Sequence, residues 1–433
     1  MAPAVAAGLV AATGTIGADC RWFAALGRAI VHGGGVPSEV AYATADSSGW
    51  HDVPAAGQVL FFWLHALAAE RGFLLAQVLA VFTAVATLGV DARRRVRDGG
   101  ALALVVVAVL IAAFPAFAVV RVQLFSLALF PLLVALLRRE QARRSARIWL
   151  CVPLFAVWSN LHGAVLIGFA VAAVYLVVDR VRWQPVAGVL VLLASAGAIC
   201  ATPAGLDTIE YYRGVLSNEA AKRGIGLWAP LSLSRPFDIV LAVGALLLVT
   251  LAIRSRPPLW ELVALAALVA LTIETSRSGV WLLLFAATPA AAGVRTSFAR
   301  LRPFAAPLTL IAVAVVVASL VRGPFALGAS PRLIAAAITR AGDGPVVAEG
   351  ALAEQVALRG GRVWMSNPLD AFRRSDQALY LDWLEGRPDG DAALSRGRVA
   401  LVQVRSKAQR RLARRAEAFE LARDDEAVLY AVR

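Results

Sequence analysis

Long apolar runs separated by short basic connections fill the first three quarters of the chain. Runs such as 101–119 and 303–321 contain no charged residue. At roughly 1.5 Å per residue, a run of this length crosses a hydrocarbon core of about 30 Å. Because backbone groups inside lipid must find hydrogen-bond partners within their own segment, the pattern predicts membrane-spanning helices.

This part also contains five clusters of basic residues, and we expect all five clusters on the cytoplasmic side of the membrane. The clusters are Arg93 to Arg97, Arg138 to Arg147, Arg180 to Arg182, Arg254 to Arg256 and Arg295 to Arg302. Consecutive clusters must then be separated by an even number of crossings. The predicted spans are about 3–18, 73–90, 101–119, 122–137, 148–158, 163–179, 185–201, 237–253, 259–276, 280–294 and 303–321. This odd number, about eleven, keeps the N-terminus inside and puts the C-terminus outside.

The apolar segment Ala55 to Leu67 does not fit this count as a crossing. It is broken by His65 and bounded by Asp52 and Glu70, so we expect a helix that lies along the outer interface. The alternative is an ordinary span, with the first segment cytoplasmic or removed.

From Arg322 onward charged residues, Gly and Pro replace the apolar runs. Short apolar runs at 344–348, 361–365, 398–404 and 428–432 predict strands, and 351–358 and 378–384 have helical spacing. Alternation of the two predicts a small α/β layer with parallel neighbours. The predicted fold is therefore an α-helical polytopic membrane domain over 1–321, followed by an extracytoplasmic α/β domain over 322–433.

Composition and charge support a membrane protein. The chain is 59% hydrophobic and its mean hydropathy is +0.70. Its formal net charge of +14 lies in the connections between apolar runs rather than on one face, so no nucleic-acid partner is expected. The scarcity of lysine beside abundant Arg, Ala and Val points to a GC-rich bacterial genome. Three scattered cysteines predict neither a disulfide framework nor a zinc site.

Acidic residues and a histidine gather in the first predicted outer loop. Asp19, Glu39 and His51 are the candidates, and Asp46 and Asp52 accompany them. A carboxylate at a membrane surface can act as general base toward a hydroxyl group or bind a divalent cation. The alternative for each residue is a solvated loop.

Polar residues also mark three outer turns between predicted spans. Arg121 and Gln123 lie in one turn, Asn160 and His162 in the second, and Glu274 and Arg277 in the third. Placing ionisable groups at this depth in a membrane costs free energy, so their presence indicates a function. Here we expect a pocket for a phosphate or pyrophosphate. A snorkelling Arg121 and a structural His162 are the alternatives. The chain has no Walker loop, which disfavours an ATP-driven pump.

The order of these motifs resembles bacterial C-type (GT-C) membrane glycosyltransferases, particularly actinobacterial ones. An Asp follows the first span, and the sequence continues with Gly27 to Pro37, Arg121 to Ser126, Trp158 to Gly163, Thr202 to Gly205 and Arg277. The resemblance covers most of the membrane part. This chain has Leu227-Trp228 where such proteins often have Glu-Trp, and the acidic residue after Val-Pro is displaced to Glu39.

The resemblance implies a polyprenyl-phosphate-linked sugar as donor and a cell-envelope glycan or lipid as acceptor, at the outer face of the plasma membrane. By position, Asp19 would be the base, and Arg121, His162 and Arg277 would hold the lipid phosphate. A transporter or flippase of lipid-linked substrates and a non-catalytic membrane scaffold are the alternatives. The motif Trp364 to Phe372 is the most distinctive piece of the tail, either as a glycan contact or as a structural corner.

Overall fold

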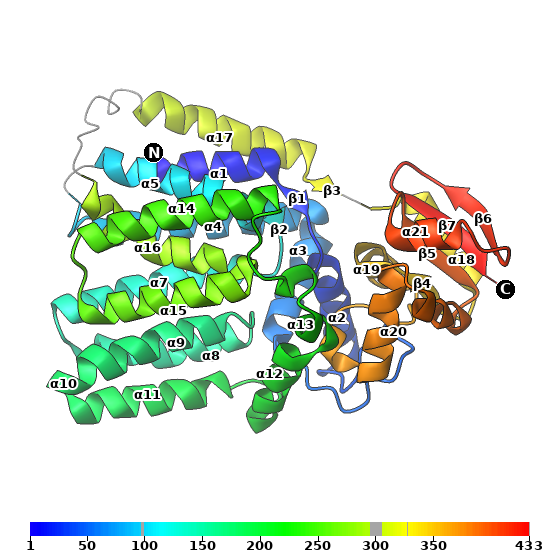
Figure 1. Ribbon diagram of the computed structural model, residues 1–433, viewed down its shortest axis with the longest axis horizontal. Helices are drawn as coiled ribbons and strands as arrows, with labels where there is room; N and C mark the ends of the chain where they lie inside the picture. The colour runs from blue at the N-terminus through cyan, green and yellow to red at the C-terminus, as the bar shows by residue number, and fades with distance from the viewer. Residues whose placement is uncertain (97–98, 295–304, 327, 433) are drawn as a thin grey trace. The chain divides into compact units, whose positions relative to one another are not determined.

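The computed structural model describes residues 1–96, 99–294, 305–326 and 328–432, and most of its elements are helices (Figure 1). The chain divides into two compact units. Unit 1 comprises Met1–Thr15, Glu70–Ala201 and Gly224–Pro324, and unit 2 comprises Ile16–Ala69, Thr202–Arg223 and Phe325–Arg433. The last junction lies close to the boundary predicted at 321, but two earlier segments belong with the C-terminal part.

Unit 1 contains a helix at each position where the sequence predicts a span. These helices are α1 (Ala2–Thr13), α4 (Glu70–Ala92), α5 (Gly99–Ala112), α7 (Leu124–Ala142), α8 (Cys151–Ser159), α9 (Val165–Tyr175), α11 (Pro185–Ile199), α14 (Pro236–Arg254), α15 (Leu259–Glu274), α16 (Gly279–Gly293) and α17 (Ala305–Arg322). Unit 1 also contains the short helices α6 (Phe114–Ala118) and α10 (Val181–Trp183) and the two-residue strand β2 (Val119–Val120). By length and composition, α4 and α14 are each long and apolar enough to cross a membrane. The number of spans stays a prediction.

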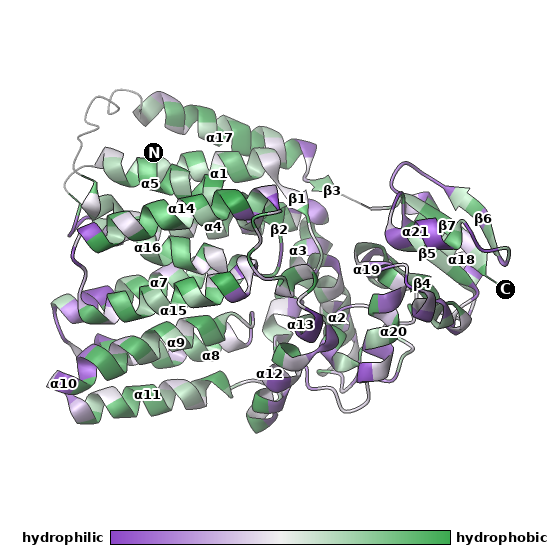
Figure 2. Cartoon of the chain, in the orientation of Figure 1, coloured by the Kyte–Doolittle hydropathy of each residue, from purple (hydrophilic) through white to green (hydrophobic). Residues whose placement is uncertain are grey.

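Hydrophobic residues predominate on the helices of unit 1 (Figure 2), and many of the large apolar ones are exposed. On α14, Val243, Leu246 and Leu247 are all exposed, Leu246 by 72%. A soluble protein rarely exposes a continuous apolar surface of this kind, whereas lipid solvates it. The surface of unit 1 therefore fits a hydrocarbon environment.

Buried ion pairs join the arginine-rich ends of several helices in unit 1. The guanidinium of Arg138 donates to Asp91 at 2.8 Å, to Glu261 at 3.1 Å and to the Phe285 carbonyl at 2.8 Å. These contacts join the C-terminal ends of α4 and α7 to the start of α15. The predicted clusters at 93–97, 138–147 and 180–182 thus contribute to packing at helix ends. Arg97 and the cluster Arg295 to Arg302 lie outside the described residues.

Unit 2 contains a four-stranded mixed sheet. Its strands β4 (Val346–Ala348), β5 (Val399–Gln403), β7 (Ala427–Val432) and β6 (Ala418–Arg423) are adjacent in this order. β4 and β5 run parallel, whereas β7 is antiparallel to both of its neighbours. The segment 361–365, predicted as a strand, forms isolated bridges of Val363 to Val346 and to Ala43, and its backbone is hydrogen-bonded both to β4 and to the first loop.

Within the described residues, unit 2 also contains eight α-helices. They are α2 (Cys20–Gly33), α3 (Ala55–Ala68), α12 (Thr208–Ser217), α13 (Glu219–Arg223), α18 (Pro331–Ala341), α19 (Gly350–Leu358), α20 (Arg374–Leu384) and α21 (Lys407–Leu412). The α2 and α3 helices pack closely at Gly27, where a Cβ atom would lie 2.1 Å from the Gln58 carbonyl oxygen. Only glycine permits that approach.

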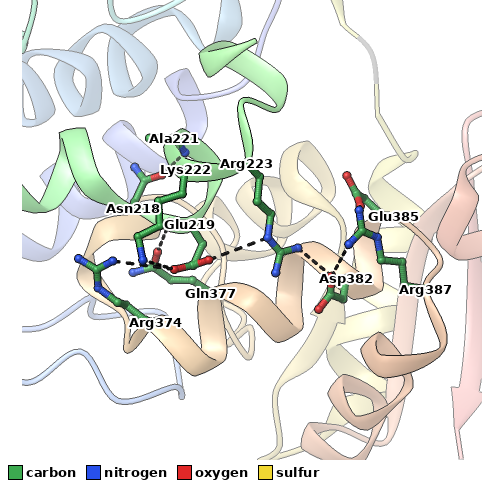
Figure 3. A network of polar contacts seen from close by, with 10 residues as sticks. All are labelled: Asn218, Glu219, Ala221, Lys222, Arg223, Arg374, Gln377, Asp382, Glu385 and Arg387. Atoms are coloured by element: carbon green, nitrogen blue, oxygen red, sulfur yellow. Dashed lines mark hydrogen bonds and ion pairs between the residues drawn. The ribbon is translucent and has the colours of Figure 1, made fainter.

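The segment 202–223 is held to α20 by a network of polar contacts (Figure 3). Arg223 lies 2.7 Å from Asp382, and the backbone N–H of Glu219 donates to the Gln377 side-chain oxygen at 2.9 Å. Exposed ion pairs contribute at most about 1 kcal/mol each, but several in a network fix one orientation. Part of the predicted long outer loop is thus helical and belongs to unit 2.

Candidate functional site

Asp19 directly precedes α2 and has an unusual backbone conformation. Its φ is 85° and its ψ is −32°, and its side chain does not cap the helix that follows. Instead its Oδ1 atom accepts the Trp22 indole N–H at 3.4 Å and the Asn367 amide at 3.4 Å. The carboxylate is therefore held by groups on both α2 and the C-terminal segment, and it is half-buried.

Further carboxyl groups of the same unit have altered acidity. Burial raises the pKa of Asp52 to about 7, and the Gln58 amide that donates to its Oδ1 at 2.7 Å opposes this rise. Desolvation raises the pKa of Asp370 to about 6, although its own backbone N–H and the Trp50 indole lower it. The first loop and the motif 364–372 thus contain carboxyl groups that titrate near neutral pH.

His51 lies near two carboxylates from another segment of unit 2. Its Nδ1 atom is 3.8 Å from Asp207 Oδ2, and the ligand atoms of His51, Asp207 and Glu210 all lie within 4.8 Å of one another. One imidazole and two carboxylates are ligands that divalent cations bind. Glu39, the second predicted catalytic residue, is exposed in the loop between α2 and α3.

His162 in unit 1 is oriented by a hydrogen-bonded chain. The Trp158 indole donates to Ser126 Oγ at 2.7 Å, and that oxygen lies 2.8 Å from His162 Nδ1. The backbone N–H of Ala164 also donates to Nδ1, at 3.2 Å. Since Nδ1 accepts these bonds, we assign the proton of the neutral ring to Nε2. The N–H donor of the neutral ring therefore lies at Nε2.

Two of the predicted binding residues use their side-chain amides to hold the backbone. Gln123 donates to the Ala116 carbonyl at 3.1 Å, and Asn160 donates to the carbonyls of Ala156 at 2.8 Å and Ala201 at 2.7 Å. Their N–H groups shape the turns that carry their neighbours. Both amides retain an oxygen that can accept a bond from a substrate.

Arg277 lies over an aromatic ring in the turn between α15 and α16. Its guanidinium carbon is 4.0 Å from the centroid of Trp228, which belongs to the residue pair Leu227-Trp228. Stacking on the ring face orients the guanidinium, whose planar N–H groups match the geometry of an oxyanion. Glu274 and Arg277 are both exposed in this turn.

The polar turns of unit 1 lie at one end of its helices (Figure 1). The start of α7 contacts His162, whereas its other end contacts Glu261 at the start of α15. Since α15 rises by roughly 1.5 Å per residue, Glu274 and Arg277 at its far end return to the level where α7 begins. Arg121, just before α7, lies at the same end. The structure thus separates the predicted phosphate-binding turns from the arginine-rich ends.

Comparison with known proteins identifies a similar fold. A solved structure of ArnT from Cupriavidus metallidurans bound to undecaprenyl phosphate aligns over 99% of this chain and 96% of its own, with 16% identity and a TM-score of 0.53. The two chains share a fold. A structure of the same ArnT in the apo state aligns over 96% and 94%, with 15% identity and a TM-score of 0.46. No protein-family model and no curated protein sequence matches the chain.

Several residues of this site escaped sequence reasoning. Glu354 and Asn367 contact Asp19 from more than 330 positions away. Asp207 and Glu210 lie near His51 in space, although more than 150 positions separate them from it in the sequence. Trp158 and Ser126 lie in the motifs Trp158 to Gly163 and Arg121 to Ser126, but only the structure shows that the two side chains meet.

Proposed function

We propose that this chain is a membrane glycosyltransferase of the C type, which moves a sugar from a polyprenyl-phosphate carrier to a cell-envelope acceptor at the outer face of the plasma membrane. The likeness to ArnT over nearly the whole chain carries the proposal, because that structure holds undecaprenyl phosphate, a polyprenyl phosphate. The motif order of the sequence supports the same donor class.

In the proposed reaction, the Asp19 carboxylate accepts the proton of an acceptor hydroxyl. The hydroxyl oxygen then forms a bond to the anomeric carbon of the sugar, while the bond from that carbon to the phosphate oxygen breaks. The leaving group is the polyprenyl phosphate dianion. Arg121, Arg277 and the Nε2–H of His162 supply the positive charge and the donors that such a dianion requires.

The test uses the full chain in lipid nanodiscs with radiolabelled undecaprenyl-phosphate sugars and an envelope extract from cells that lack the gene. We expect Asp19→Asn to lower transfer by about 100- to 10,000-fold, the usual range for a lost general base. Arg277→Gln should mainly raise the KM for the donor.

The matched control is Asp46→Asn. Asp46 is an exposed carboxylate of the same loop, bonded to Ser48 and paired with Arg373, so its loss should leave transfer unchanged. Glu39→Gln tests the other acidic candidate, and because this side chain is exposed we expect a smaller loss than for Asp19. Transfer at the wild-type rate by Asp19→Asn would remove Asp19 as the base.

A further inference from the structure

The backbone of Asp19 is held in a conformation that a non-glycine residue rarely adopts. A positive φ at such a residue costs on the order of 1–3 kcal/mol and persists only where surrounding contacts enforce it. Asp is a good helix N-cap, yet here its side chain makes no capping bond. The carboxylate therefore bonds to the side chains of Trp22 and Asn367 rather than to the backbone of the first turn.

The contact that enforces this conformation comes from α19. Both carboxylate oxygens of Glu354 accept the backbone N–H of Asp19, at 3.1 and 3.0 Å, and Glu354 is 0% exposed. The Asn367 amide bridges the two acids, at 3.1 Å from Glu354 Oε1 and 3.4 Å from Asp19 Oδ1. One carboxylate thus fixes the main chain of Asp19, and one amide joins both side chains.

A second contact docks the same two helices. The Arg28 guanidinium on α2 donates to the carbonyls of Leu358 and Ala357 at the end of α19, at 2.8 and 2.9 Å. The hydroxyl of Tyr42 donates to the Asn367 carbonyl and holds the bridging residue in place. The groups around Asp19 are therefore fixed at three separate points.

Stability alone does not account for a carboxyl group at position 354. A buried carboxylate is costly, and a second carboxylate beside it adds repulsion. Burial and then Asp19 raise the pKa of Glu354, whereas the Asp19 N–H, Asn367 and Arg21 oppose the rise. Tyr42 and Tyr380 are the other titratable groups that face it. A glutamine in its place would offer one acceptor oxygen instead of two and would set an NH2 donor against the Asp19 N–H or the Asn367 amide.

We propose that Glu354 and Asn367 are positioning residues for Asp19, so that the C-terminal part of the chain is an integral piece of the catalytic centre. This inference rests on the proposed function of Asp19 as the base. It also assigns the motif Trp364 to Phe372 a role in holding the base.

The first measurement does not depend on activity. Hydrogen-exchange mass spectrometry of a peptide that spans Asp19 should show its amides exchanging at least about tenfold faster in Glu354→Ala, because the N–H acceptor is lost. The matched control is Glu349→Ala. Glu349 precedes the same helix, is also buried, and bonds to Ser406 rather than to Asp19. Unchanged exchange at Asp19 in Glu354→Ala would overturn the positioning role.

The second measurement uses the donor assay in nanodiscs. Glu354→Gln should lower kcat by about 10- to 100-fold with little change in donor KM, because a small displacement of a base is enough for such a loss. Glu349→Gln should stay within about twofold of wild type. Added to Asp19→Asn, the Glu354→Gln change should cause no further loss, since both act through one group.

The possible failures can be told apart. A wild-type protein that transfers no sugar would contradict the proposed function, while the exchange experiment would still decide whether Glu354 holds Asp19. A wild-type kcat in Glu354→Gln, or equal losses in Glu354→Gln and Glu349→Gln, would contradict the catalytic consequence of positioning. If the double variant lost the activity of Asp19→Asn and, in addition, the full loss of Glu354→Gln, Glu354 would act only on the fold.

Discussion

At the residue scale, unit 2 concentrates buried carboxyl groups whose acidity is set by desolvation. Burial raises the pKa of Glu349 to about 7, as it does for Asp52, and Ser406 opposes the rise. Each of these groups keeps its proton in the folded protein at a pH where the unfolded chain has lost it. Their ionisation therefore opposes folding as the pH rises.

Asp52 gives a direct test of this linkage. Between pH 3.8 and about 7 the folded protein binds the Asp52 proton more tightly than the unfolded chain does. The free energy of unfolding therefore falls as the pH rises through this window, and this loss is complete above it. Within the described residues, Asp52 Oδ2 and Gln58 Oε1 both lack a hydrogen-bond partner, and an Asn amide would supply a donor. We expect Asp52→Asn to raise the thermal unfolding midpoint at pH 8 by more than at pH 5, with a gain on the order of 4 kcal/mol at most.

The control is Asp46→Asn, since hydrogen bonds from Ser48 lower the pKa of that exposed carboxyl. Replacing Asp46 by Asn should not raise the thermal unfolding midpoint at pH 8. Equal shifts of the Asp52→Asn midpoint at both pH values would contradict the raised pKa.

At the element scale, α3 and α4 show how a single residue divides an apolar stretch. Ala69 has a positive φ of 50° and separates α3 from α4. The 14 residues of α3 rise about 21 Å. Its outward face carries Leu60, Trp63 and Leu67, the last exposed by 81%. This spacing suits a helix that lies in a membrane interface.

Spin labels test the interfacial position of α3. In a variant without the native cysteines, nitroxides attached through Trp63→Cys and Leu67→Cys should collide more with oxygen than with a water-soluble nickel complex. A label at Ser48→Cys, in the exposed loop of the same unit, should show the reverse preference. Labels on α3 that behave like the Ser48 label would exclude lipid contact for this helix.

At the scale of the whole molecule, the two ends of unit 1 differ in chemistry. One end holds paired arginines and carboxylates, and the other holds His162 and the Arg277–Trp228 stack. This division is what the positive-inside rule requires if the second end faces outward.

Labelling of the two ends of α14 tests the orientation. Ser234 and Ser255 flank this helix, which spans roughly 28 Å at 1.5 Å per residue. In intact cells, a membrane-impermeant maleimide should modify Ser234→Cys, and it should reach Ser255→Cys only after the membrane is permeabilised. The opposite pattern would place the candidate phosphate-binding turns in the cytoplasm and end the proposed reaction.

The sequence by itself determined the helices of unit 1 and most of the C-terminal strands, because apolar run length and alternation are local properties. It also located Asp19, His162 and Arg277 as candidates from their positions between runs. The strand predicted at 361–365 is reduced to single bridges of Val363 with Val346 and with Ala43, the latter more than 300 positions away. Only the tertiary structure decided that segments 16–69 and 202–223 belong with the C-terminal part, and that Glu354 holds Asp19. Such contacts depend on chain topology, which a pattern of neighbouring residues does not encode.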